Sequence, residues 1–316
     1  MKAAVINQYG PPEVFQVLEI NNPVITNREV LIKVFAASVN PVDWKQRQGW
    51  HRWFLKANFP VVLGYDVAGE IVECGSQVTE FSVGDKVFCR LTRRFGGAFA
   101  EYAAASAGTL AKKHDALSWE EAAAIPLAGL TALQGLREIA HLQPGESVLV
   151  TGAAGGVGHF ALQVARKMGG KVTAVCSGRH KQMMEELKPD QYLDYTIVNF
   201  KERQEKYDIV FDAAGVESYL TCKHVLNPKG RFITTLPRPK LLIHKILALF
   251  SRGKKVKTFV MKSSGNDLDE FSEMVKKGEI RIFIDSIFPL DKIADAHRRA
   301  EEYQTEGKIV VKVMGE

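Results

Sequence analysis

Four glycines between an apolar run and an amphipathic segment are the residues of this 316-residue chain best suited to do chemistry. The segment VLVTGAAGGVGHFALQVARKMGG carries Gly152, Gly155 and Gly158 in a G-x-x-G-x-x-G pattern, with Gly156 beside them. Glycines between a strand and a helix let the backbone approach a pyrophosphate, whose charge the helix N-terminus stabilises. The pattern predicts a dinucleotide site. The alternative is a tight turn that binds nothing.

The strand after this turn, KVTAVC, indicates which dinucleotide binds. An NAD site usually has Asp or Glu at the end of that strand, about 20 residues on, to hold the ribose 2′-hydroxyl. Here the strand is followed by Ser177, Arg179 and Lys181, with no carboxylate. These cations would attract a 2′-phosphate. The sequence therefore predicts NADPH rather than NADH, and the alternative is a solvated basic helix start.

Composition excludes several classes of protein. Hydrophobic residues make up 46% and charged residues 25% of the chain, as in ordinary soluble proteins of about two domains. The net charge is +6, but no basic tract alternates with aromatic residues, so we expect no nucleic-acid partner. We find no bilayer-length apolar run and no signal peptide, and expect a cytoplasmic protein without stable membrane insertion. The four cysteines form no C-x-x-C pair.

Two kinds of pattern must position the glycine turn. The first hundred residues contain short β-type runs separated by turn signals, whereas strands and helices alternate after residue 117. Ser118 and Glu121 form a capping-box pattern at the start of that region. A final strand could pair back with the first region. We expect early strands at 30–39, 67–75, 85–91 and 99–106, later strands at 147–151, 171–176, 208–211, 231–235 and 308–313, and helices at 118–136, 158–168, 180–187, 217–226, 267–277 and 291–303.

Six motifs in order resemble the medium-chain dehydrogenase/reductase superfamily, in its zinc-independent, quinone oxidoreductase-like branch. They are SVNPVDWKQRQG, LGYDVAGEIVECGSQVTEFSVGDKVF, GGAFAEYA, AAAIPLAGLTALQGL, VTGAAGGVG and YDIVFDAAG. The resemblance implies an α/β fold: a GroES-like β-barrel domain plus a Rossmann domain with a doubly wound parallel sheet. We expect the first domain at residues 1–117 with a return segment at 263–316, and the NADP-binding domain at 118–262.

The same resemblance argues against a catalytic metal. Zinc-dependent members use a Cys, a His-Glu pair and a further ligand. The matching positions here are Asn40 and the segment Gly64-Tyr65-Asp66, and the cysteine lobe of a structural zinc is absent. Three protein ligands for a catalytic zinc are therefore missing. Cys89 and His51 could approach a metal, but their spacing gives no support.

Position by position, the resemblance assigns further residues to the cofactor. Thr131 matches a residue facing the nicotinamide end, and Tyr195 one near the adenosine end, where a half-buried strand-end tyrosine is the alternative. The remaining positions are the pyrophosphate turn, the turn after a later strand, and a segment passing the nicotinamide: Gly152, Ala153, Gly155, Gly156, Val157 and Gly158; Ala213, Ala214 and Gly215; Phe259 and Met261.

Two residues are candidates on the substrate side. The Asn40 amide could donate to a carbonyl oxygen as enolate charge develops, or it could be a turn residue before Pro41 satisfied by the backbone. Tyr65 is a possible proton donor, and Asp43 is expected to brace the loop. Where related enoyl-thioester reductases have a tyrosine, this chain has Gly49-Trp50-His51, so His51 would have to substitute.

Together with these residues, the resemblance implies an NADPH-dependent oxidoreductase that transfers a hydride to a small electrophile, a quinone or an α,β-unsaturated carbonyl compound, without zinc. The alternatives are an enoyl-thioester reductase, an alcohol dehydrogenase-like enzyme, or a non-catalytic NADPH- or RNA-binding protein. The family suggests a homodimer.

The segment RPKLLIHKILALFSRGKKVK at 238–257 is apolar, is flanked by cations and contains no acid. We interpret it as a helical cover over the substrate cleft or a dimer neighbour. An anionic or lipid-like substrate and contact with an anionic membrane surface are the alternatives.

Overall fold

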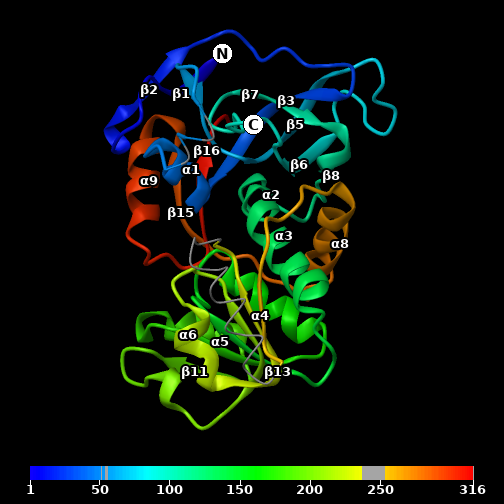
Figure 1. Ribbon diagram of the computed structural model, residues 1–316. Helices are drawn as coiled ribbons and strands as arrows, with labels where there is room; N and C mark the ends of the chain where they lie inside the picture. Colours follow the sequence, from blue (N-terminus) through cyan, green and yellow to red (C-terminus); the bar gives the residue numbers. More distant parts are fainter. Residues whose placement is uncertain (51, 54–55, 237–252, 316) are drawn as a thin grey trace. The chain divides into compact units, whose positions relative to one another are not determined.

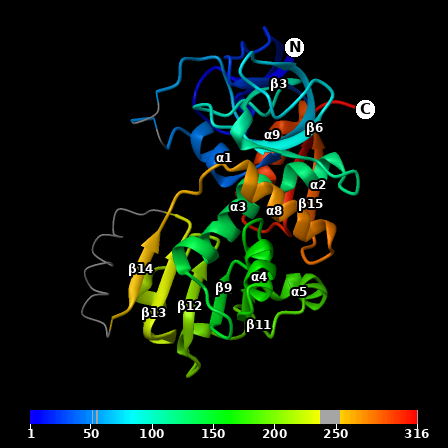
Figure 2. The ribbon, with the colours of Figure 1, turned by 90° about the vertical axis from the view of Figure 1, so that its right-hand side faces the viewer.

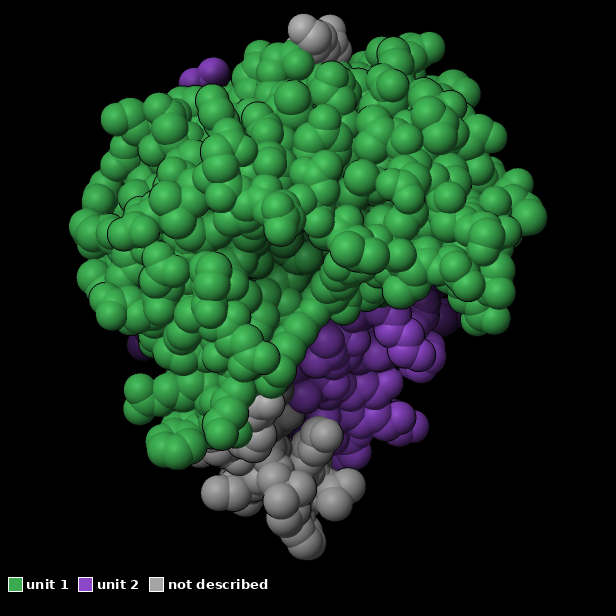
Figure 3. Space-filling view, turned by 90° about the horizontal axis from the view of Figure 1, so that it is seen from above, with its two compact units in different colours: residues 1–130, 263–278, 282–316 green, residues 131–262, 279–281 purple. Residues whose placement is uncertain are grey.

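The chain folds into two compact units. The structure is a computed structural model that describes residues 1–50, 52–53, 56–236 and 253–315 (Figure 1). Unit 1 comprises residues 1–130, 263–278 and 282–316, and unit 2 comprises residues 131–262 and 279–281 (Figure 3). Unit 1 is rich in β-structure and unit 2 contains a parallel sheet, as the sequence predicts. The expected boundary after residue 117 precedes helix α2 (Trp119–Ala124), which packs against β3 and β5 of unit 1.

Unit 1 is built around β3, an eleven-residue strand (Glu29–Val39). It is buried over most of its length, so its sequence is a continuous apolar run rather than an alternating one. It lies within a sheet of order β15-β16-β3-β5-β6-β8, with β7 also paired to β3, and a second sheet has the order β2-β1-β4. The other strands are β1 (Lys2–Ile6), β2 (Phe15–Glu19), β4 (Val61–Val62), β5 (Asp66–Cys74), β6 (Lys86–Arg90), β7 (Tyr102–Ser106), β8 (Leu110–Lys112), β15 (Ile284–Pro289) and β16 (Lys308–Lys312).

The C-terminal strand returns to the first region of the chain. β16 pairs antiparallel with β3, with Ile309 opposite Val39, and Figure 1 shows the red end of the chain beside the blue strand. This confirms the expected pairing. The described helices of unit 1 are α1 (Pro41–Arg47), α2, α8 (Gly265–Lys276) and α9 (Ile293–Glu301), and α3 (Pro126–Gln134) runs across the boundary at residue 130.

Unit 2 contains a six-stranded parallel sheet of order β11-β10-β9-β12-β13-β14 (Figure 2). The chain proceeds from β9 to one side through β10 and β11, and then to the other side through β12, β13 and β14. The order therefore reverses between β9 and β12, which makes this the topological switch point. The elements are β9 (Ser147–Thr151), α4 (Gly158–Lys167), β10 (Lys171–Cys176), α5 (Lys181–Leu187), β11 (Gln191–Asp194), β12 (Tyr207–Asp212), α6 (Tyr219–Cys222), β13 (Leu226–Thr234) and β14 (Lys255–Thr258).

The helix expected over 118–136 is two helices. The capping box is confirmed, since Ser118 Oγ accepts from the Glu121 amide at 3.0 Å and Glu121 accepts from the Ser118 amide at 2.8 Å. The first helix nevertheless ends at Ala124, and α3 starts at Pro126, whose ring removes a backbone donor and suits a first helical position.

Two further expectations need correction. The helix expected over 217–226 is only one turn, α6, because β13 already begins at Leu226. The pairing of β13 with β12 is irregular until Arg231, the residue at which the sequence predicts the strand to start. The strand expected from residue 99 begins at Tyr102. Strands β4, β8, β11, β14 and β15 are not among the strands expected from the sequence, and they are short or partly exposed.

Candidate functional site

The glycine turn of unit 2 follows β9 and leads into α4. Gly152 has φ +66°, a conformation that favours glycine, and a Cβ there would lie 2.6 Å from Ala214 Cβ. A Cβ at Gly158 would lie 2.0 Å from the Gly152 carbonyl oxygen. Both glycines are therefore required by close packing at the point where the strand becomes a helix.

The middle of the turn has room for a ligand. Gly155, Gly156 and Val157 are partly exposed, and a Cβ at Gly155 would meet only the Gly152 carbonyl oxygen, at 3.4 Å. The turn precedes the ten-residue helix α4, whose N-terminus favours an anion. This cradle fits the pyrophosphate of a dinucleotide.

A buried carboxylate joins the strand ends at the switch point. Asp212 Oδ1 accepts from Thr151 Oγ1 at 3.0 Å and from the Val216 amide at 3.2 Å, and its Oδ2 accepts from Thr234 Oγ1 at 2.9 Å. These bonds link the carboxyl ends of β9, β12 and β13. Burial raises the pKa of Asp212, while these donors oppose the rise. Asp212 is not among the candidate residues predicted from the sequence, although an aspartate that ends an apolar strand of the predicted parallel sheet was a usable signal.

The residues expected at the adenosine end lie near the carboxylate of Asp194, which is also not among the residues predicted from the sequence. Ser177 is buried, and Arg179 and Lys181 are exposed. A Cβ at Gly178 would lie 2.2 Å from Asp194 Oδ2. Bonds from Thr196 hold the pKa of Asp194 below its ordinary value, and the Gly178 amide adds to this effect. A negative charge therefore lies beside the turn because the end of β11 is adjacent to the end of β10.

The other expected cofactor residues of unit 2 occupy separate elements. Tyr195 follows β11, is 57% exposed, and donates its amide to the Cys176 carbonyl at 3.3 Å. Thr131 is buried on α3, and the Phe259 ring would lie 2.7 Å from a Cβ at Gly135, just after that helix. Ala153, Ala213 and Met261 are buried; Ala214 is exposed, and Gly215 has φ +66°.

Unit 1 contains a buried polar cluster around Asp66. Its Oδ2 accepts from Ser38 Oγ at 3.0 Å and from Asn40 Nδ2 at 2.9 Å, and its Oδ1 accepts from the Leu127 amide at 3.0 Å. Lys308, the first residue of β16, donates to Asn40 Oδ1 at 2.5 Å. Ser38, Asn40, Asp66 and Lys308 are each at most 3% exposed. The candidate Asn40 therefore lies inside a network that joins β3, β5, β16 and the starts of α1 and α3.

Tyr65, the other substrate-side candidate, is also bonded within unit 1. Its hydroxyl accepts from Gln46 Nε2 at 2.7 Å and donates to the Arg94 carbonyl at 2.9 Å, and its side chain is 5% exposed. The Arg90 guanidinium lies 4.7 Å from its ring centroid. Burial raises the pKa of the Tyr65 phenol, which makes it a weaker acid.

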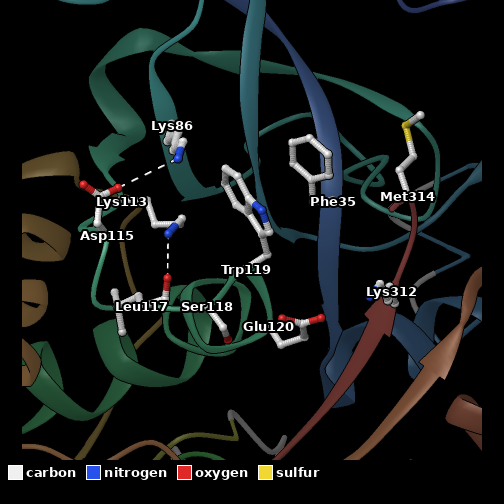
Figure 4. A pocket seen from close by; sticks show the side chains of 10 residues that line it. All are labelled: Phe35, Lys86, Lys113, Asp115, Leu117, Ser118, Trp119, Glu120, Lys312 and Met314. Carbon is white, nitrogen blue, oxygen red and sulfur yellow. Dashed lines mark hydrogen bonds and ion pairs between the residues drawn. The ribbon is translucent and has the colours of Figure 1, made fainter. Parts of the chain in front are cut away.

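A cavity of about 430 Å³ is a further feature of unit 1 (Figure 4). Its wall includes the stacked rings of Phe35 and Trp119, whose centroids are 4.6 Å apart. Lys113 donates to the Leu117 carbonyl at 2.5 Å, and Lys86 lies 3.8 Å from Asp115. These contacts stabilise the chain that leads into α2.

Comparisons with known proteins agree with this architecture. A family model described as an alcohol dehydrogenase GroES-like domain matches residues 26–115, and one described as a zinc-binding dehydrogenase matches residues 187–311. The chain is 34% identical to a chloroplast envelope quinone oxidoreductase homolog of Arabidopsis thaliana, over 98% of both chains. It is also 34% identical to a chloroplastic NADPH-dependent alkenal/one oxidoreductase of that plant, over 98% of this chain and 79% of the relative. The structure of the quinone oxidoreductase from Coxiella burnetii superposes with a TM-score of 0.93 at 33% identity, over 99% of each chain.

A glycine turn at the switch point of a parallel sheet, in one chain with a GroES-like unit, defines a dinucleotide-dependent dehydrogenase or reductase. The chain belongs to the medium-chain dehydrogenase/reductase superfamily, in its quinone oxidoreductase-like branch, a family of NAD(P)H-dependent oxidoreductases.

One of the matching family models is described as a zinc-binding dehydrogenase, so the question is whether the residues at the matching positions fit a zinc site. Among the described residues, no three His, Cys, Asp or Glu side chains are grouped so as to hold a metal ion. At the matching positions, Asn40 Nδ2 donates to Asp66 Oδ2, the Lys308 ammonium bonds Asn40 Oδ1, and the Leu127 amide donates to Asp66 Oδ1. Cys89 is fully buried, which raises the pKa of its thiol, and His51 lies outside the described residues. The described side chains of this cluster do not fit a zinc site.

Most of the basic apolar segment, residues 238–252, lies outside the described residues, so its expected role as a cover stays a prediction. Its described end forms β14, and Lys254 donates to the Lys223 carbonyl at 2.6 Å. Within the described parts of the chain, none of the helices has the length and apolar character needed to cross a bilayer.

Proposed function

We propose that this protein is an NADPH-dependent reductase that transfers a hydride to a quinone or to an α,β-unsaturated carbonyl compound without a catalytic zinc ion. The observation that carries the proposal is the cradle at Gly155–Val157 at the switch point, together with Ser177 and Arg179 directly after the next strand, β10. Similarity over 98% of this chain to relatives named quinone oxidoreductase homolog and NADPH-dependent alkenal/one oxidoreductase supports the cofactor and the acceptor class.

NADPH, when bound, supplies the hydride. The acceptor takes this hydride and one proton and becomes a hydroquinone or a saturated carbonyl compound, while NADP⁺ is released. Quinones and enones already delocalise the incoming charge, so they need less electrophilic help than a plain ketone. The contribution of the protein is to bind the pyrophosphate, orient the reactants and exclude water.

Asn40 is the proposed donor to the acceptor oxygen. Its Nδ2 bond to Asp66 is 2.9 Å long, whereas its contact with the Ser38 carbonyl is 3.5 Å. The longer contact is the weaker one, so the N–H that faces Ser38 can donate to a substrate oxygen while Asp66 holds the other N–H of this planar amide. An Asn40→Ala variant should lose kcat by about 10- to 100-fold if this oxyanion role is correct.

Tyr65 is the weaker candidate for proton donation because its hydroxyl already donates to the Arg94 carbonyl and its pKa is raised. We propose solvent as the main proton source. Tyr65→Phe should then keep kcat within about threefold and lower the melting temperature. A loss of kcat of tenfold or more without loss of stability would restore the donor role.

The decisive experiment measures NADPH oxidation against quinones, enones, enoyl thioesters and simple ketones, with and without a chelator. We expect turnover of quinones or enones that the chelator leaves unchanged. Preferential turnover of thioesters would support an enoyl-thioester reductase, and chelator-sensitive turnover of ketones an alcohol dehydrogenase-like enzyme. Tight NADPH binding with no turnover of any acceptor would support a non-catalytic binding protein.

Location and assembly are further proposals. We propose a cytoplasmic homodimer that acts on a small electrophile and has no nucleic-acid partner. The names of relatives include chloroplastic and mitochondrial proteins, so fractionation of cells is the test of location. Light scattering of the purified protein tests the dimer.

A further inference from the structure

Lys308 is a buried lysine in unit 1 to which the proposed reaction assigns no role. Its side chain is 3% exposed and its ammonium faces three oxygen atoms. These are Asn40 Oδ1 at 2.5 Å, the Val39 carbonyl at 3.3 Å and Asp66 Oδ2 at 3.7 Å. A buried ammonium is costly unless it is paired with an anion and hydrogen-bonded, and this arrangement provides both.

The partner carboxylate is the centre of the cluster. Asp66 bonds to Ser38 at the end of β3, to Asn40 before α1 and to the Leu127 amide in the first turn of α3. Burial raises the pKa of Asp66, and the ammonium opposes this rise. The Asp66 carboxylate accepts all three bonds. Without a cation nearby, it would either take up a proton or, if it stayed ionised, strongly destabilise the fold.

We propose that Lys308 is the built-in cation of this cluster: its ammonium neutralises Asp66, holds Asn40 Oδ1, and so positions Asn40 and the start of α3. It faces Asn40 Oδ1 and Asp66 Oδ2, two of the oxygen atoms that a metal ion in this cluster would need as ligands. Lys308 is thus a positioning residue, and the chain supplies the positive charge itself. The inference concerns unit 1 alone and does not depend on the acceptor that the enzyme reduces.

A double-mutant cycle tests the charge pairing. Lys308→Met keeps the apolar stem and removes the ammonium, so we expect the melting temperature to fall by about 5 °C or more. Asp66→Asn removes the carboxylate charge while keeping an acceptor oxygen. The combined variant should melt at a higher temperature than Lys308→Met alone, because no uncompensated charge remains buried. Simple addition of the two losses would overturn the proposal.

The exposed Lys312 on the same strand provides a matched control. Lys312→Met removes the same charge from β16 and should change the melting temperature by less than about 2 °C. An equal loss in both lysine variants would assign the effect to net charge. If Lys308→Met does not fold, folding of the combined variant still supports the pairing, and failure of both contradicts it.

The pH profile separates pairing from packing. The charged and titratable groups facing Asp66 are Lys308, Arg90, Asp43 and Cys89, and only the first changes in the single lysine variant. Its stability deficit should therefore widen from pH 5 to pH 8, as Asp66 must ionise without its partner, and the combined variant should not show this widening. A deficit independent of pH would indicate lost packing.

Metal analysis closes the test with a readout that is independent of activity. After equilibration with micromolar zinc and gel filtration, the wild-type protein should carry far less than one zinc per chain, and a chelator should not shift its melting temperature. Stoichiometric zinc that is lost in Asp66→Asn would overturn the proposal. Failure of the quinone and enone assays would leave all these results unaffected, so the two proposals are tested separately.

Discussion

The carbonyl oxygen of Gly152 lies 2.0 Å from the position that a Cβ of residue 158 would occupy. At Gly155 the same oxygen is 3.4 Å from such an atom, which is an ordinary contact. Gly158 and Gly155 of the same motif therefore have different structural roles. The first of these contacts fixes the strand–helix junction, and the second leaves space for a ligand.

This difference predicts opposite phenotypes for two alanine variants. Gly158→Ala should destabilise the protein by about 2 kcal/mol or more, because backbone must move. Gly155→Ala should fold normally but weaken NADPH binding by about tenfold or more, since the methyl group projects into the cradle. Urea unfolding and titration of cofactor fluorescence measure the two effects. If the folded Gly155→Ala variant binds NADPH with unchanged affinity, the prediction that this turn binds the pyrophosphate is wrong.

Cofactor preference should depend on Arg179. This side chain is exposed just after β10, and the ionised Asp194 lies beside the preceding Gly178. Arg179→Ala should lower the ratio of kcat/KM for NADPH over NADH by about tenfold, and added salt should reduce the wild-type ratio. Lys171→Ala, at the other end of the same strand, is the matched control. If Arg179→Ala and Lys171→Ala lower the ratio equally, the preference for NADPH depends on the net charge of the protein and not on Arg179.

Asp43 should make the protein less stable as the pH rises toward 8. It is fully buried, its Oδ1 has no hydrogen-bond partner among the described residues, and burial raises its pKa from 3.8 to about 8. The folded state therefore holds a proton that the unfolded state releases above pH 4, so stability falls by up to about 1.4 kcal/mol per pH unit between pH 4 and pH 8. Asp43→Asn keeps the bond from the Asn40 amide and should flatten this slope. If Asp43→Asn leaves the pH dependence of stability unchanged, a group other than Asp43 causes it.

His297 should act in the opposite direction, at acid pH. Its ring is fully buried, lies 4.8 Å from the Phe15 ring and 5.5 Å from the Phe99 ring, and neither ring nitrogen has a partner among the described residues. Burial lowers its pKa well below 6.5, and Arg47 adds to this effect.

Since the unfolded state takes up a proton below pH 6.5 and the folded state does not, stability is lost as the pH falls, by up to about 1.4 kcal/mol per unit. His297→Phe should reduce this slope in urea unfolding between pH 6.5 and pH 5. An identical acid slope in both proteins would show that the ring is protonated in the folded state.

Elements with strong local signals could be predicted from the sequence. The segments 147–151 and 158–168 differ from β9 and α4 by no more than one residue, because hydrophobic periodicity and the glycine turn mark their ends. The prediction of a helix over 217–226 was wrong because α6 ends at Cys222, a 3-10 turn follows over Lys223–Val225 and β13 begins at Leu226. A short apolar run does not distinguish helix from strand.

The polar clusters could not be predicted in the same way. Asp66 and Lys308 are 242 positions apart, and they come to one place because β3 pairs antiparallel with both β16 and β5. Asp194 lies beside Gly178 because β11 and β10 are parallel neighbours. Neither relationship leaves a trace in local composition, since each depends on which strands pair.

The amino-acid order alone determined the class of the fold, the position of the glycine turn and the family, because glycine spacing, strand–helix alternation and motif order are local properties. Tertiary structure decided which charges face each other, and so which predicted donors are already bonded. Asn40 illustrates the division. Its place before Pro41 is evident from the sequence, but its bonds to Asp66 and Lys308 exist only because three distant strands converge in a core where an unpaired charge would be too costly.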